Sequence, residues 1–167
     1  MMLKILVFSD SHGRLLSMYD AIEREQPNAV IHLGDYDEDA RDLQRSYPDL
    51  QIWRVRGNND YGADSPLHAV IRPDDVPIYL THGHCEHVAG TSTGRLTQHA
   101  REVGCALALF GHTHRALYGE CEGIRVLNPG SISLPRGGPA SYARLTIAEG
   151  AVRQVTLLRA DGKPLYA

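Results

Sequence analysis

The sequence is poor in the features that mark secreted, membrane-spanning and nucleic-acid-binding proteins. Three cysteines in 167 residues are too few and too scattered for a disulfide framework, which favours a reducing, cytoplasmic location. No apolar run approaches the roughly 20 residues of a membrane span. We expect no signal peptide, because the segment after Met1 continues directly into a strand-like stretch. The formal net charge of −3 gives no electrostatic footprint for nucleic acid, so we expect neither a nucleic-acid nor a membrane partner.

Large aromatic side chains are also scarce, with two Phe and one Trp, but the chain contains nine His. Seven of the nine lie between His68 and His114. The imidazole ring binds metal ions and exchanges protons near neutral pH. The content of hydrophobic residues (43%) and charged residues (22%) is that of an ordinary globular protein. The excess of His is therefore the compositional feature that calls for a functional explanation.

The first half of the chain alternates between strand-like and helical patterns. Continuous apolar runs predict strands, and apolar residues at helical spacing, with Pro27 after them, predict the first of two helices. The order β-α-β-α-β favours a parallel sheet with right-handed crossovers. The expected strands are 3–8, 29–33 and 52–55, and the expected helices are 14–25 and 39–46.

The second half is richer in strands and contains one convincing helix, at residues 93–103. Alternation of apolar and polar residues in its last two strands indicates half-buried antiparallel strands. The strand content is too high for one sheet, and no linker marks a second domain. We predict a single domain over residues 1–167, of α/β class, with two packed sheets flanked by helices. The further strands expected are 68–71, 78–81, 106–110, 116–121, 125–127, 141–147 and 152–158.

Short polar blocks follow five of the predicted strands, each with a Gly beside Asp, Asn or His. Ligands bind at the carboxyl ends of strands in open α/β sheets, where loops converge. Carboxylates, imidazoles and amide oxygens bind divalent metals, and a carboxylate bridges naturally between two ions. One such block is more typical of a cap or a turn, but five together favour a metal site. The blocks are Asp10-Ser11-His12-Gly13, Gly34-Asp35, Gly57-Asn58-Asn59-Asp60, His82-Gly83-His84 and Gly111-His112-Thr113-His114.

These blocks resemble the five motif blocks of the calcineurin-like metallophosphoesterases. The small size and the segment 127–131 (LNPGS) resemble the compact bacterial and archaeal phosphodiesterase branch of that family, the YfcE-like proteins. The resemblance spans residues 3 to about 158 and implies a four-layer α-β-β-α sandwich with two packed mixed sheets. It also implies a dinuclear metal centre that hydrolyses a phosphate ester by attack of a metal-bridging hydroxide. The ligands it implies are Asp10, His12 and His114 for the first metal, Asp35 as the bridge, and Asn58, His82 and His112 for the second metal.

The third block departs from the family pattern. Many members have a His directly after the Asn, where it is thought to bind phosphate and protonate the leaving group. This chain has Asn59, which can donate a hydrogen bond to a phosphoryl oxygen but cannot usefully deliver a proton. Asn59 and His84 are therefore the candidate catalytic residues, with an ordinary loop position as the alternative for His84. Arg136 has a weaker claim to a substrate phosphate.

The cofactors, substrate and partners are predicted by class. We expect two divalent metal ions, with Mn favoured and Fe, Ni, Zn or Mg as alternatives, because Asp/His/Asn sites accept all of them. The expected partner is a small-molecule phosphate ester, and a homodimer is compatible with the small size. The alternative function is a non-catalytic metal-binding or protein-interaction scaffold on the same fold, although intact ligand positions favour an enzyme. A nuclease is disfavoured, because the chain has no extra domain and no basic groove.

Two further features have structural rather than catalytic interpretations. The acidic run 37–39 predicts a solvated helix N-terminus, where carboxylates are favourable. His32 lies within a predicted strand, and we expect it to be a hydrogen-bonded core residue or a residue behind the site.

Overall fold

The computed structural model describes residues 1–89 and 92–166, and in this part of the chain ten strands and three α-helices form. The predicted elements are all present, with boundaries that differ by a few residues at most. Their order along the chain is β1 (Met2–Phe8), α1 (Leu16–Glu25), β2 (Ala29–His32), α2 (Asp37–Ser46), β3 (Gln51–Arg54), β4 (His68–Ile71), the 3-10 turn η1 (Pro73–Asp75), β5 (Ile78–Thr81), α3 (Gly94–Glu102), β6 (Leu107–Leu109), β7 (Ala116–Cys121), β8 (Ile124–Pro129), β9 (Ser141–Ala148) and β10 (Ala151–Arg159).

The strands form two mixed sheets of five strands each. The first has the order β10-β9-β1-β2-β3, in which β1, β2 and β3 are parallel and β9 and β10 are antiparallel neighbours. The second has the order β4-β5-β6-β8-β7, in which β5, β6 and β8 are parallel and the two edge strands are antiparallel. The crossovers through α1 and α2 give the parallel pairing that the β-α-β-α-β pattern predicts.

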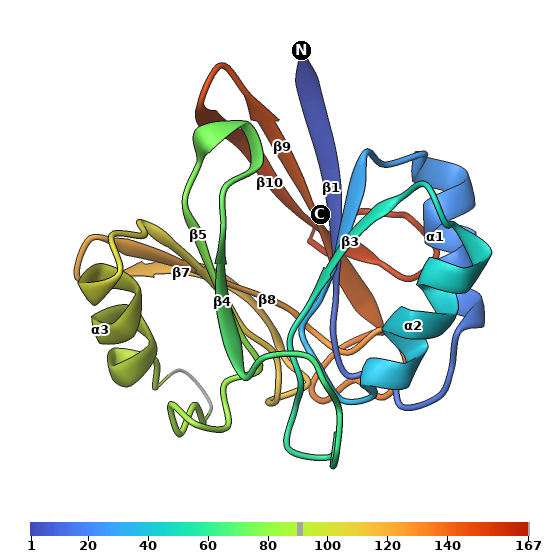
Figure 1. Cartoon of the computed structure of the whole chain (residues 1–167), viewed down its shortest axis with the longest axis horizontal. Helices are drawn as coiled ribbons and strands as arrows, with labels where there is room; N and C mark the ends of the chain where they lie inside the picture. The colour runs from blue at the N-terminus through green and yellow to red at the C-terminus, as the bar shows by residue number, and fades with distance from the viewer. Residues whose placement is uncertain (90–91, 167) are drawn as a thin grey trace.

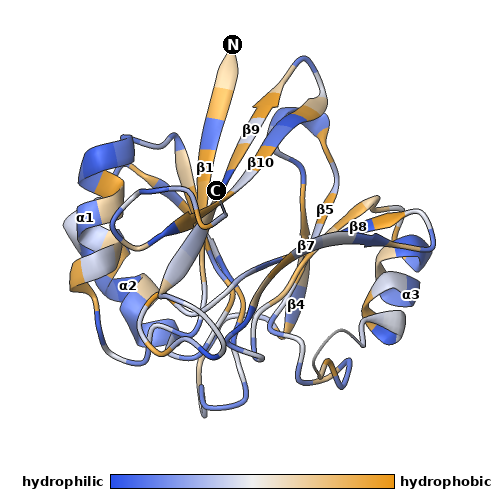
Figure 2. Ribbon diagram, turned by 180° about the vertical axis from the view of Figure 1, so that it is seen from behind, coloured by the Kyte–Doolittle hydropathy of each residue, from blue (hydrophilic) through white to orange (hydrophobic). Residues whose placement is uncertain are grey.

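Helices cover the outer faces of the two sheets, and the inner faces pack on one another (Figure 1). Side chains alternate along each strand. Ile5 and Val7 of β1 enter the core between the sheets, whereas Leu6 and Phe8 enter the core under α1 and α2. Tyr79 of β5 packs toward α3 in a third core. Figure 2 shows the apolar residues along the strands and hydrophilic residues on the helices. This is the four-layer α-β-β-α sandwich, so the predicted fold class is confirmed.

The acidic run after β2 differs from the prediction of a solvated helix end. Asp37 and Asp39 are buried, at 3% and 4% exposure, although both lie in the first turn of α2. The carboxylate of Asp37 pairs with Arg54 and accepts a hydrogen bond from the hydroxyl of Ser65. Asp39 accepts one from the backbone N–H of Gly13 at 2.8 Å. The solvated interpretation was wrong for these two residues, because partners distant in the sequence compensate the buried charge.

In the part of the chain that the structure describes, no helix has both the length and the apolar character that a membrane span requires. The organisation of residues 1–167 as one domain stays a prediction.

Candidate metal centre

The predicted ligands lie in five loops that meet at one end of the sandwich. Three loops follow β1, β2 and β3 of the first sheet, and two follow β5 and β6 of the second. All five strands are parallel members of their sheets, so their carboxyl ends point the same way within each sheet. The packing of the sheets then brings the two sets of loops together. Loops from both sheets therefore contribute side chains to one cluster.

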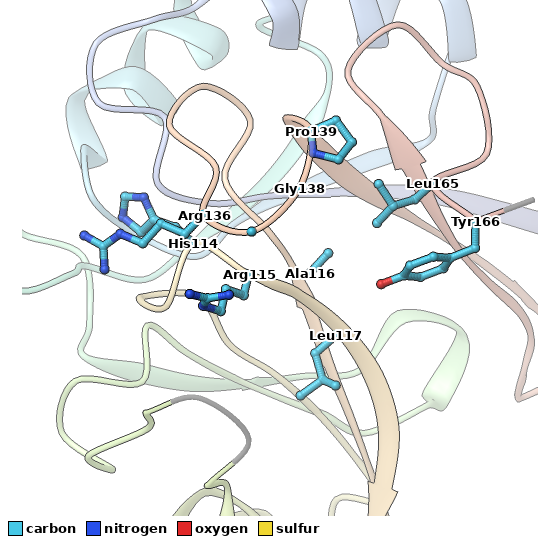
Figure 3. A pocket seen from close by; sticks show the side chains of 10 residues that line it. His114, Arg115, Ala116, Leu117, Arg136, Gly138, Pro139, Leu165 and Tyr166 are labelled. Carbon is cyan, nitrogen blue, oxygen red and sulfur yellow. The ribbon is translucent and has the colours of Figure 1, made fainter.

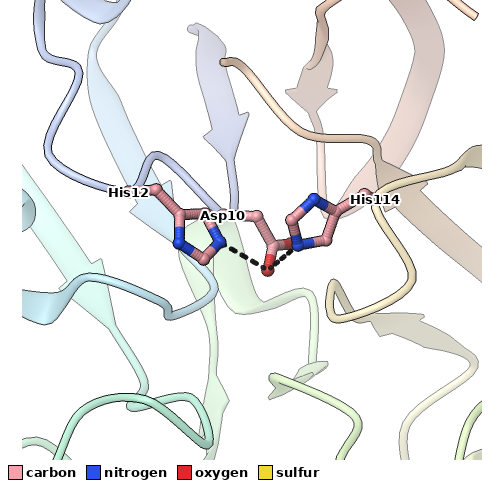
Figure 4. A group of neighbouring side chains, drawn as sticks. All are labelled: Asp10, His12 and His114. Carbon is pink, nitrogen blue, oxygen red and sulfur yellow. Dashed lines mark ion pairs between the residues drawn. The ribbon is translucent and has the colours of Figure 1, made fainter. Parts of the chain in front are cut away.

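One group of side chains consists of Asp10, His12 and His114 (Figure 4). Oδ1 of Asp10 lies 3.9 Å from Nε2 of His12 and 3.3 Å from Nε2 of His114. The two imidazole rings have centroids 5.1 Å apart and converge on the carboxylate from two loops. Their ligand atoms are within the spacing that a single metal ion can span.

A second group shares Asp10 with the first and adds Asp35 and His82. Nε2 of His82 lies 3.7 Å from Oδ1 of Asp10 and 3.6 Å from Oδ1 of Asp35. The other oxygen of Asp35, Oδ2, lies 3.8 Å from Nε2 of His12. The two carboxylates thus lie between the imidazoles of the two groups, and Asp35 turns one oxygen toward each group.

His112 and Asn58 complete the cluster on the side of His82. Nδ1 of His112 lies 3.1 Å from Oδ1 of Asn58, and the rings of His112 and His82 have centroids 5.2 Å apart. The backbone N–H of His112 donates to Oδ2 of Asp10 at 3.1 Å. All seven predicted ligands are therefore brought together.

The cluster contains buried polar atoms that have no hydrogen-bond partner among the described residues. They include Oδ1 of Asp10, Nε2 of His12 and Nε2 of His82. Leaving a buried carboxylate oxygen without a hydrogen-bond partner costs about 3 kcal/mol or more. All three atoms belong to the two groups above, and each is a metal-ligand type. The residues therefore fit a divalent cation, which would compensate the buried charge.

Hydrogen bonds behind two of the imidazoles fix which ring nitrogen faces the cluster. Nδ1 of His82 lies 2.8 Å from the carbonyl oxygen of Leu33, and Nδ1 of His114 lies 2.7 Å from that of Leu134. A carbonyl only accepts, so each Nδ1 carries the proton and donates. In the neutral ring, Nε2 then presents a lone pair to the cluster. This is the usual support of a metal-binding His.

The backbone of the site is held in an uncommon conformation. Five of the seven candidate ligands have positive φ, a region that non-glycine residues rarely occupy. Such residues persist only where the surrounding structure enforces them, and they concentrate at functional sites. The values are 54° at Asp10, 50° at His12, 46° at Asp35, 69° at His112 and 59° at His114.

Asp60 joins the loop after β3 to the loop after β2. Its carboxylate accepts three backbone hydrogen bonds, from Asp35 at 2.9 Å, from Asp37 at 2.7 Å and from Gly57 at 2.7 Å. The loops approach so closely that a Cβ atom on Gly57 would overlap the side chain of Asp35. Asp60 belongs to the third block of the sequence. Nothing in that block reveals that the carboxylate oxygens of Asp60 hold the backbone of Asp35, the candidate bridging ligand.

Ser131 of the LNPGS segment and Ser133 shortly after it hold the first ligand loop from the other side. The hydroxyl of Ser131 donates to the backbone oxygen of Asp10 at 2.8 Å, and the hydroxyl of Ser133 donates to that of Ser11 at 2.6 Å. The fully buried ring of His32 lies 2.8 Å from the hydroxyl of Ser11. His32 is thus the hydrogen-bonded residue behind the site that its strand position predicts.

The charges of the cluster favour an ionised Asp10 beside imidazoles. Burial opposes ionisation of Asp10, but the ring of His114 3.3 Å away, the neighbouring His82 and the hydroxyl of Ser9 outweigh it and hold the pKa of the carboxyl below its ordinary value. The carboxylate of Asp10 beside its Nε2 raises the pKa of His114 against the effect of burial. Burial, with the proximity of His82, lowers the pKa of His112.

The two candidate catalytic residues lie at the edge of the cluster. The side-chain amide of Asn59 donates to Oδ2 of Asp35 at 2.7 Å. The ring of His84 lies beside His82, with centroids 5.5 Å apart, and its Nδ1 is a further buried atom without a partner among the described residues. Burial, followed by the influence of His82, lowers the pKa of His84. A catalytic role for either residue stays a prediction.

Residues 3–150 match the model of the calcineurin-like phosphoesterase superfamily domain, so the chain belongs to this superfamily. It is 31% identical over 153 residues to the probable metallophosphoesterase YsnB of Bacillus subtilis, covering 89% of this chain and 87% of the relative. It is 28% identical over 169 residues to the phosphodiesterase YfcE of Escherichia coli, covering 86% and 88%. The predicted family is confirmed.

Solved structures show the same fold. A predicted phosphoesterase of Streptococcus pneumoniae superposes with a TM-score of 0.82 and 32% identity, over 100% of this chain and 95% of that chain. Vacuolar protein sorting 29 of Cryptosporidium parvum has the same fold at a TM-score of 0.70 and 18% identity, over 93% and 96%. The fold therefore occurs both in phosphoesterases and in a protein named for vacuolar sorting.

Proposed function

We propose that this protein is a dinuclear-metal-dependent phosphodiesterase that hydrolyses a small-molecule phosphate ester. The observation that supports it most is the convergence of the seven predicted ligands, with buried carboxylate and imidazole atoms that lack partners among the described residues. The relatives support the reaction class, because they are named metallophosphoesterases and phosphodiesterases.

In this proposal Asp10, His12 and His114 hold one ion, and Asn58, His82 and His112 hold the other. Asp35 lies between the two sets, and its two oxygens face His12 and His82 respectively, which supports a bridging role. Bound at these residues, two divalent ions would supply an activated water as nucleophile and would neutralise charge on the phosphoryl group. We propose manganese as the metal and the cytoplasm as the location.

The chain's own groups prepare the site for this chemistry. Carbonyl oxygens fix the ring nitrogens of His82 and His114, so no reorganisation of these rings is needed on binding. The amide of Asn59 orients Asp35, and in this proposal it also donates a hydrogen bond to a phosphoryl oxygen. Nδ1 of His84 lies beside His82 without a partner among the described residues, which makes His84 the alternative candidate for protonating the leaving group.

The alternative is a non-catalytic scaffold, which the fold similarity to vacuolar protein sorting 29 keeps open. A scaffold does not require a complete set of ligand positions in strained loops. The completeness of the cluster, with five ligands at positive φ, favours catalysis over interaction.

A screen of purified protein separates these functions. The protein is stripped with chelator, Mn, Fe, Ni, Zn or Mg is added back singly, and hydrolysis of phosphomonoesters and phosphodiesters is measured. We expect the activity to depend on metal and to be higher on diesters. Absence of hydrolysis with every metal, while ions bind to the cluster, would favour the scaffold.

A further inference from the structure

A cavity of about 670 Å³ lies directly beside the candidate metal centre. It is bounded by the start of β7, by the loop before β9 and by the C-terminal segment that follows β10 (Figure 3). His114 lines both the cavity and the metal-ligand cluster. The volume is in the range of pockets that bind nucleotide-sized molecules. A substrate bound at the metals therefore has space for a substituent in this direction.

Two arginines lie at the end of the cavity next to His114. Arg115 directly follows His114 in the chain. The backbone N–H of Arg136 donates to the carbonyl oxygen of His114 at 2.9 Å. Among the described residues, neither guanidinium forms an ion pair or a side-chain hydrogen bond. By contrast, Arg54 and Arg144 are in ion pairs. Two guanidinium groups at this end of the cavity, without an ion-pair partner among the described residues, fit a phosphate, which they can bind through charge-assisted hydrogen bonds.

The other end of the cavity is apolar and aromatic. Leu117 of β7 lies opposite Leu165 and Tyr166 of the C-terminal segment (Figure 3). Backbone hydrogen bonds hold this segment on the sheet, from Leu165 to Leu157 at 3.0 Å and from Arg159 to Lys163 at 2.8 Å. Tyr166 is nevertheless 66% exposed, so its ring is accessible to a ligand. Such a surface fits a flat ring, which stacks on aromatic side chains.

We propose that this cavity binds one substituent of a phosphodiester substrate, and that this substituent carries a flat ring and a second phosphate. The second phosphate binds to Arg115 and Arg136, and the ring lies against Leu165 and Tyr166. The assignment of the substrate class rests on the proposed phosphodiesterase function. A nucleoside-type substituent with an additional phosphate has this combination of ring and charge.

A matched pair of substrates tests the proposal. The p-nitrophenyl ester of thymidine 5′-phosphate is compared with the same ester carrying a 3′-phosphate, and nitrophenolate release gives kcat/KM for both. We expect the wild type to prefer the phosphorylated ester by about tenfold or more, the equivalent of one charge-assisted contact. The preference should decrease with added salt, because the contact is electrostatic. Equal kcat/KM for the two esters would overturn the proposal.

Variants assign the preference to the cavity. In Arg115→Gln and Arg136→Gln we expect the ratio of the two kcat/KM values to fall to below about threefold. Tyr166→Ala should lower both values and leave the ratio unchanged. Arg95→Gln is the matched control, since Arg95 is an exposed residue of α3 outside the cavity. A ratio that survives both cavity variants, or that Arg95→Gln lowers equally, would overturn the proposal.

A binding measurement without metal separates this inference from the proposed function. Thymidine 3′,5′-bisphosphate is titrated into chelator-treated protein by calorimetry. We expect binding that Arg115→Gln weakens by about tenfold. If neither ester is hydrolysed with any metal but this binding occurs, the enzyme proposal fails and the cavity proposal stands. If both esters are hydrolysed at equal rates and the bisphosphate does not bind at millimolar concentration, the enzyme proposal stands and the cavity proposal fails.

Discussion

The side-chain amide of Asn59 donates a hydrogen bond to Oδ2 of Asp35 at 2.7 Å, and the backbone N–H of the same residue donates to Oδ1 at 3.0 Å. Asn59 therefore fixes both oxygens of the carboxylate that lies between the two groups of candidate ligands. The position where the family resemblance leads one to expect a His is occupied by a residue that supports a ligand. Residues that orient metal ligands typically contribute 10–100-fold to metal affinity.

Asn59→Ala should therefore weaken Mn²⁺ binding by about tenfold, because Oδ2 of Asp35 loses its amide donor. Calorimetric titration of chelator-treated protein measures the affinity. Gln98→Ala serves as control, since Gln98 is exposed on α3 and, among the described residues, its side chain bonds only to Glu102. An affinity unchanged by Asn59→Ala would mean that the hydrogen bond does not position Asp35.

The missing His predicts a dependence on the leaving group. General-acid catalysis is worth about 10²–10⁴-fold in rate, and a p-nitrophenolate leaves without it whereas an alkoxide does not. We expect ready turnover of p-nitrophenyl phosphodiesters and much slower turnover of alkyl phosphates. Asn59→His should narrow the gap by accelerating the alkyl substrates preferentially, provided that the bond to Asp35 is retained.

His84 is the competing candidate for the proton donor. If His84 donates the proton, the wild type already hydrolyses alkyl esters, and His84→Ala loses this activity while retaining the p-nitrophenyl activity. Comparable wild-type rates on both ester classes that His84→Ala leaves unchanged would contradict the whole argument from leaving-group protonation.

Much of the fold and the ligand set follows from local patterns. Strands such as β1 and β5 are continuous apolar runs, and each ends at a block that contains a ligand candidate, so the pattern and the topology rule together locate the site. The strand content predicted two packed sheets flanked by helices, and the family resemblance implied the four-layer order. The strand order within each sheet was not predicted, because strand pairing in the second half is nonlocal.

What the sequence did not reveal depends on contacts between distant residues. Asp37 is buried because Arg54 and Ser65 lie against it, and no local pattern of the acidic run indicates these partners. The role of Asp60 depends on which backbone groups its carboxylate reaches. The cavity beside His114 needs the C-terminal segment to fold back on β10, which composition alone does not predict.

Asp60 should contribute to stability as well as to the site. Asp60→Ala leaves the backbone N–H groups of the buried residues Asp35, Asp37 and Gly57 without their acceptor, and should lower the free energy of unfolding by about 3 kcal/mol. Urea denaturation measures this. Asp64→Ala is the matched control, because Asp64 is an exposed partner of Arg41 and should change stability much less. If the two variants lose equal amounts of unfolding free energy, the backbone hydrogen bonds of Asp60 do not contribute the stability expected of them.

Glu25 gives a prediction for the pH dependence of stability. Burial opposes its ionisation, but the hydrogen bonds from Arg144 and Tyr142 outweigh it, so the pKa of Glu25 lies below its ordinary value of 4.5. The contribution of ionised Glu25 to the stability of the fold is therefore fully present above pH 4.5. It is lost as the pH falls through the lower pKa that Glu25 has in the folded state. Glu25→Gln should cost about 1 kcal/mol at neutral pH. The difference between the two proteins should shrink below pH 4.5, and a constant difference down to strongly acid pH would contradict the ion-pair account.

In the proposed function, the cluster around Asp35 holds two divalent ions, and hydrolysis requires both of them. The most direct test is the number of bound ions per chain, measured by elemental analysis after Mn²⁺ loading, together with the hydrolysis of bis(p-nitrophenyl) phosphate in the same samples. The wild type should bind two ions and lose its activity with chelator, and Asp35→Asn should lose ions and activity together, since a neutral amide bridges poorly. Two ions per chain with activity retained in Asp35→Asn, or full wild-type activity in chelator, would contradict the account.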